Sequence, residues 1–125
     1  RLKNYIEIRN HDSNSLSFAL ALCALYKGIC LGDIEELINK LKILKIQDTD
    51  KYFELSSKLG LDFKIGNTEA WQIVGNIFNF SSNNLNSKER MYLEPILNLI
   101  KQRKTPADIL IGNNIENACD LINFL

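Results

Sequence analysis

The chain has 125 residues, enough for one domain with a modest core, and 46% of them are apolar. Fifteen basic and fifteen acidic side chains cancel to zero net charge, which argues against nucleic acid and an anionic membrane as electrostatic partners. No apolar stretch reaches the roughly 18 residues that a membrane span requires. The three cysteines, Cys23, Cys30 and Cys119, form no CxxC pair, which predicts buried thiols, a reducing cytoplasmic compartment and no metal site built from cysteine.

The stretch 1–12, RLKNYIEIRNHD, alternates between apolar and polar residues as a half-buried β-strand does. Ile6 and Ile8 would face one side, and Glu7 and Arg9 the other. On a rigid strand, a carboxylate can hold a hard cation such as Mg²⁺, and a guanidinium can hold a phosphate through its planar fork. The plainer alternative is a cross-strand ion pair on a solvated face.

A polar turn follows over residues 10–15, and it is rich in residue types that cap helices. Asp12 either caps the next helix or turns back toward the polar face of the strand. A lone strand has unpaired edges and is not stable by itself. We therefore expect the chain to be a piece of a longer protein that supplies the rest of a sheet.

Three helices are predicted next. Residues 16–29 are apolar on nearly all sides, which predicts a central buried helix. Asp33 begins a second helix, with Glu36 as its capping-box partner and an apolar stripe that continues to Leu44. Asp48 or Thr49 begins a third helix, which ends at Gly60.

The second half of the chain contains a short strand and more helices. The strand is expected over 61–65, and Gly66–Asn67 turns the chain. Thr68 caps a helix over 69–80, in which Trp71, Val74, Ile77 and Phe78 face inward. A mobile polar loop follows over 81–87. The remaining elements are a helix from Ser87 that Pro95 kinks, a short helix begun by Thr105–Asp108, and a last helix over 115–124.

Two stretches resemble the C-terminal part of glutamate–cysteine ligases. RLKNYIEIRNHDSNSLSFALALCALYKG, residues 1–28, is similar to the family's YIEIR strand, the acidic residue after it and the alanine- and leucine-rich helix that ends in Lys-Gly. YLEPILNLIKQRKTPADIL, residues 92–110, is similar to a late helix and a Thr-Pro-Ala-Asp/Glu turn. His11, and the absence of a proline at Leu16–Ser17, depart from the family pattern.

The resemblance implies an ATP-dependent enzyme of glutathione biosynthesis that joins glutamate to cysteine through a γ-glutamyl phosphate. It implies that Glu7 is a metal ligand for Mg²⁺, that Arg9 is a catalytic residue that binds ATP and the transferring phosphate, and that Asp12 lies at the rim of the nucleotide site. The implied partners are the N-terminal part of the same enzyme and the small molecules glutamate and cysteine. Residues 1–125 alone are expected to be inactive.

The expected fold is mainly α: a strand and turn over 1–12, then a region of six or seven helices over 13–125, within one domain. Two alternatives remain open. One is a helical interaction or scaffold module without chemistry, and the other is a different carboxylate–amine ligase of the same fold.

Overall fold

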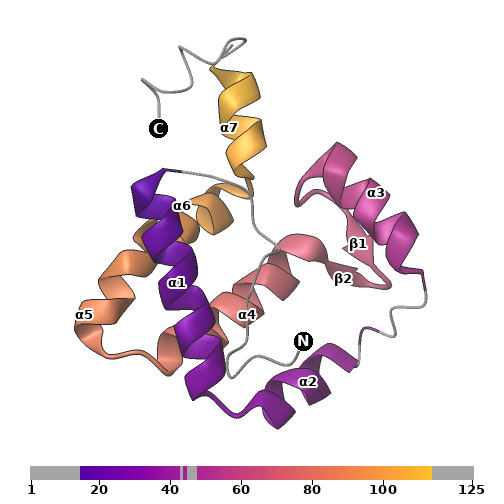
Figure 1. Ribbon diagram of the computed structural model, residues 1–125. Helices are drawn as coiled ribbons and strands as arrows, with labels where there is room; N and C mark the ends of the chain where they lie inside the picture. The colour runs from indigo at the N-terminus through magenta and orange to yellow at the C-terminus, as the bar shows by residue number, and fades with distance from the viewer. Residues whose placement is uncertain (1–14, 43, 45–47, 114–125) are drawn as a thin grey trace, which may run out of the picture.

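A computed structural model describes residues 15–42, 44 and 48–113, and these residues form a mainly helical fold, as the sequence predicts, together with one two-strand antiparallel sheet. Figure 1 shows the arrangement. The elements are α1 (Leu16–Leu31), α2 (Ile34–Lys42), α3 (Thr49–Leu59), β1 (Lys64–Ile65), β2 (Thr68–Glu69), α4 (Ala70–Asn83), α5 (Ser87–Arg90), the 3₁₀ helix η1 (Met91–Leu93), α6 (Glu94–Gln102) and α7 (Pro106–Gly112). The predicted strand over 1–12 and the predicted helix over 115–124 lie outside the described residues.

Helices α1 and α4 cross at the centre of the fold, and small residues allow them to approach closely (Figure 1). Ala21, Ala24 and Gly28 recur at intervals of three and four along α1, so they share one face of the helix, and all three are buried. Ser81 of α4 is fully buried against this face, and its hydroxyl donates a hydrogen bond of 2.8 Å to the carbonyl oxygen of Leu25. A backbone carbonyl and a serine therefore join the two helices.

The apolar core lies where α1, α4, η1 and α6 meet. Leu93 is 1% exposed and forms a cluster with Ala24, Phe78 and Leu85. Leu25, Ile96, Leu97 and Ile100 pack around this cluster. Leu93 reaches the core because the 3₁₀ turn redirects the chain between α5 and α6.

Helix α3 lies beside the hairpin β1–β2 (Figure 1). Lys64 pairs with Glu69 and Ile65 with Thr68, and Gly66 adopts φ +62° between them. The rings of Tyr52 and Phe63 stack with their centroids 6.4 Å apart. No residue of α3 is buried, so this helix is a peripheral element.

Three expectations about local structure prove wrong. Thr68 belongs to β2, and α4 begins after Glu69, which makes no side-chain cap. The predicted mobile loop over 81–87 is largely ordered, because α4 continues to Asn83 and the capping box of Asn86 starts α5. The single helix expected from Ser87 is divided by η1, and Pro95 lies in the first turn of α6.

The predicted burial of α1 and of the Cys23 and Cys30 thiols is also wrong, while Cys119 lies outside the described residues. Only one side of α1 is buried, and Leu16 is 76% exposed at its first turn. Cys23 and Cys30 are exposed. Among the helices of the described ranges, none is long and apolar enough to cross a membrane alone. Of these described helices, only α1 and α2 taken together reach the required length and apolar composition, and they are bent by 98° at the break between them.

Candidate functional site: the grooves on the two sides of α4

The residues predicted to bind nucleotide and metal, Glu7, Arg9 and Asp12, lie outside the described part of the chain. The described residue nearest to them in sequence is Ser15, whose hydroxyl accepts a hydrogen bond from the backbone N–H of Phe18 and caps α1. The capping role considered for Asp12 is therefore filled by Ser15. The roles of Glu7, Arg9 and Asp12 in binding remain predictions.

A polar groove of about 590 Å³ lies between α2 and α4. The α4 side is a row of carboxamides, and the α2 side carries charges; the lining residues are Asp33, Glu36, Lys40, Asn76, Asn79, Phe80, Asn83 and Asn84. Asn76, Asn79 and Asn83 fall three and four residues apart, which places them on one face of the helix.

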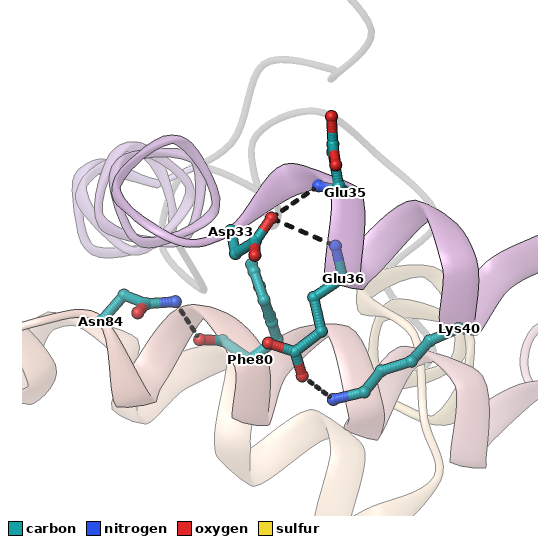
Figure 2. A network of polar contacts seen from close by, with 6 residues as sticks. All are labelled: Asp33, Glu35, Glu36, Lys40, Phe80 and Asn84. Carbon is teal, nitrogen blue, oxygen red and sulfur yellow. Dashed lines mark hydrogen bonds and ion pairs between the residues drawn. The ribbon is translucent and has the colours of Figure 1, made fainter.

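The α2 wall of this groove is fixed by its own hydrogen bonds (Figure 2). Asp33 Oδ1 accepts from the backbone N–H groups of Glu35 at 3.0 Å and Glu36 at 3.2 Å, so it caps the helix as predicted. Glu36 does not complete a capping box, because its carboxylate forms an ion pair with Lys40 one turn later. Figure 2 shows this pair reaching toward α4 while Glu35 points away.

The α4 wall is held close to the turn between α1 and α2. Asn84 Nδ2 donates a hydrogen bond of 2.8 Å to the carbonyl oxygen of Phe80 (Figure 2). A Cβ atom on Gly32 would lie 2.3 Å from Asn84 Nδ2 and 2.5 Å from the Phe80 ring. A side chain on Gly32 would therefore require the Asn84 carboxamide or the Phe80 ring to move. The groove presents both donors and acceptors, which suits a polar ligand better than an apolar one.

A second, mainly apolar groove of about 340 Å³ lies on the other side of α4, against α6. Its lining is Trp71, Gln72, Gly75, Asn76, Phe78, Asn79, Leu97 and Ile100. Asn76 and Asn79 border both grooves, so they form a polar ridge between them. Arg103 lies at the Trp71 end, with its guanidinium carbon 4.3 Å from the centroid of the indole ring.

Among the described residues, two carboxylates have shifted pKa values, and both stabilise helix starts. The hydrogen bond from Lys27 lowers the pKa of Glu89 below its ordinary value of 4.5, and bonds to Asn86 act in the same direction. The backbone N–H of Thr105 lowers the pKa of Asp108 below its ordinary value of 3.8, and the Thr105 hydroxyl adds to this effect. Neither group lines the grooves beside α4.

The sequence does not predict either groove as a whole, because each combines residues from helices that are distant in the chain. The asparagines at 76, 79 and 83 were a visible signal: three carboxamides at helical spacing beside an apolar stripe mark a polar face. Within the described ranges, no group of three or more histidine, cysteine, aspartate or glutamate side chains has the arrangement of a metal site.

Comparison with known proteins adds no relative. No family model, no curated protein and no solved structure matches this chain. The fold is that of a mainly helical unit with a polar and an apolar groove on the two sides of its central helix.

Proposed function

We propose that this chain is the C-terminal portion of an ATP-dependent ligase that joins glutamate to cysteine in glutathione biosynthesis. The observation that carries the proposal is the sequence of residues 5–9, YIEIR, followed by an acidic residue at 12 and an alanine- and leucine-rich helix that includes Lys27-Gly28. Two local findings support it. The helix expected after the first stretch is α1, although it continues beyond Lys27-Gly28 to Leu31, and the Thr-Pro-Ala-Asp stretch begins α7 through a capping box.

In the proposed reaction, a γ-carboxylate oxygen of glutamate attacks the γ-phosphorus of ATP, and ADP leaves. The amine of cysteine then attacks the acyl carbon, a proton is lost from nitrogen and phosphate leaves. Arg9 would hold the transferring phosphoryl group, and Glu7 would hold Mg²⁺, which neutralises phosphate charge. Such transfers depend mainly on positioning and charge stabilisation, which a carboxylate and a guanidinium on one rigid face can provide. Asp12 is assigned to the rim of this site.

The test is ADP release by the complete gene product, with glutamate alone and with glutamate plus cysteine. Glu7→Gln and Arg9→Gln should each reduce turnover by about 10²–10³-fold, by analogy with the loss of single stabilising groups in other enzymes. Lys3→Gln is the matched control, because it removes a charge from the same predicted strand face outside the YIEIR sequence. Unchanged turnover in both Glu7→Gln and Arg9→Gln would overturn the assignment.

A second candidate function is a helical interaction module without chemistry. One observation favours it: Leu16 is 76% exposed and Met91 is 73% exposed. Leu20 and Met91 also line a groove of about 450 Å³ between α1 and the η1–α6 segment. This candidate predicts ATP turnover that is independent of Glu7 and Arg9.

A different carboxylate–amine ligase would instead keep the dependence on Glu7 and Arg9 and release ADP with another acid or amine, which the two assays with glutamate distinguish.

A further inference from the structure

The apolar groove between α4 and α6 is kept open by a glycine that packing does not require. Gly75 lies in the interior of α4, where glycine weakens a helix relative to alanine. A Cβ atom there would meet only Ile100 Cγ2, at 3.9 Å, which is an ordinary contact. Gly28 is different, because its Cβ would lie 2.2 Å from Ser81 Oγ. Gly75 therefore needs a reason other than the packing of the fold.

Arg103, at one end of the same groove, is the second residue here that departs from local preference, because its backbone conformation favours glycine. It is the only non-glycine among the described residues with positive φ, at 53°, in the left-handed position after α6 that glycine usually occupies. Its guanidinium lies over the ring of Trp71. Places where a chain breaks such local rules are commonly functional.

The guanidinium of Arg103 over Trp71 places one positive charge at this end of the groove. Lys101, Arg103 and Lys104 are exposed and close together in sequence. Within the described residues, Arg103 has no carboxylate partner, since the four ion pairs found there involve other residues. A guanidinium stacked on an aromatic ring keeps N–H donors at its edge, and these suit a carboxylate.

The other border of the groove suits a peptide main chain. Asn76 and Asn79 stand on the ridge above the apolar floor. Each carboxamide offers both donors and acceptors, as each peptide unit does. The floor itself, which Phe78, Leu97 and Ile100 help to form, suits an apolar side chain.

We propose that this groove binds an extended segment of a partner protein in which an apolar residue lies next to an acidic one. The apolar side chain occupies the space over Gly75, the carboxylate lies against Arg103, and the main chain contacts Asn76 and Asn79. This proposal does not depend on ligase activity.

The test is selection of random dodecapeptides displayed on phage against the full chain, followed by titration of the enriched peptides. An enriched motif with Asp or Glu beside Leu, Ile, Met or Phe is expected. Gly75→Leu fills the groove and should weaken binding more than about tenfold, because burial of one large apolar side chain is lost. Gly75→Ala is the matched control that fills little of the groove and should retain most of the affinity.

The charge contact has its own pair of variants. Arg103→Gln should weaken binding several-fold and reduce its dependence on salt, whereas Lys88→Gln, an exposed charge on α5, should change neither. Three outcomes would overturn the proposal: no enrichment, a motif without an acidic residue, or peptides that bind Gly75→Leu as tightly as the original chain. Self-association that Gly75→Leu abolishes would also overturn it, since the groove would then hold a second copy.

Discussion

Gly28 and Gly75 show how two glycines inside helices can have opposite roles. A Cβ on Gly28 would lie 2.2 Å from Ser81 Oγ and 2.3 Å from the Ser81 carbonyl oxygen, so α1 and α4 would have to separate. We expect Gly28→Ala to lower the free energy of unfolding by about 1–3 kcal/mol, the usual cost of overpacking. Gly75→Ala should raise it by about 0.5–1 kcal/mol, because alanine favours the helix and fits. Urea denaturation followed by circular dichroism measures both, and equal effects of the two changes would contradict this account.

Arg103 combines an unfavourable backbone conformation with a favourable ring contact. The backbone N–H of Lys104 donates to the Leu99 carbonyl oxygen and that of Arg103 to the Ile100 carbonyl oxygen, so the turn after α6 requires the left-handed residue. Its strain costs about 1 kcal/mol, and the contact with Trp71 offsets about 0.5–1 kcal/mol.

The two terms predict different effects of two substitutions at Arg103. Arg103→Gly removes both the strain and the contact, so the free energy of unfolding should change little. Arg103→Ala keeps the strain and should destabilise the fold by about 0.5–1 kcal/mol. Trp71 is the only tryptophan, so its fluorescence reports the loss of the contact in both variants. Equal stability of the two variants would show that the backbone term is absent.

At the scale of single elements, the capping box of α7 should make stability depend on acid pH. Asp108 Oδ2 accepts from the Thr105 backbone N–H at 2.7 Å and from Thr105 Oγ1 at 2.8 Å. These bonds lower the pKa of Asp108 in the folded state below its ordinary value of 3.8. The folded state therefore binds protons less readily than the unfolded state, so this stabilisation is present above the ordinary pKa and is lost as pH falls through the lowered one.

We expect Asp108→Asn to lower the melting temperature at pH 7 and to flatten its decline below about pH 4. Thr105→Val keeps the shape of the side chain and removes one bond to the carboxylate, so it should destabilise by about 1 kcal/mol and flatten part of the same decline. Melting temperatures recorded by circular dichroism between neutral and acid pH test both variants. A decline in Asp108→Asn as steep as that of the original chain would assign the acid sensitivity to other groups.

The elements that sequence predicts well are those whose signals are local. Thr105 and Asp108 are three residues apart, and Asp48 accepts from the Lys51 backbone N–H, so each helix start is determined within one turn. The hairpin was only half predicted. Residues 68–69 gained strand geometry by pairing with Lys64–Ile65, and this pairing outweighed the preference of Thr68 for a cap.

At the scale of the whole molecule, composition predicted the mainly helical class but not which faces are buried. The apolar residues of α1 suggested burial on all sides, yet small residues form its contact face, and Leu16 and Leu20 remain exposed. Burial depends on which helices lie nearby, and that information is distributed over the whole chain. The assignment of Glu7, Arg9 and Asp12 rests on the sequence pattern, whereas the two grooves beside α4 depend on how α2, α4 and α6 are arranged in space.

Unequal packing predicts that the molecule opens in parts. α4 has five buried residues, whereas neither α3 nor α7 has any. Amide hydrogens in the middle of α4, and those of α1 that face it, should therefore exchange most slowly, and those of α3 most rapidly among the longer helices. Native-state hydrogen exchange read by mass spectrometry or NMR measures this order.

Leu93→Ala separates the core from the periphery in the same experiment. Leu93 is 1% exposed and packs with Ala24, Phe78 and Leu85, so its truncation should cost about 2–5 kcal/mol. Protection should fall together in α1, α4 and α6, because these helices share the cluster, while the already rapid exchange of α3 should change little. Uniform protection across α3 and α4, or a loss confined to α6, would mean that the four-element core does not unfold as one cooperative unit.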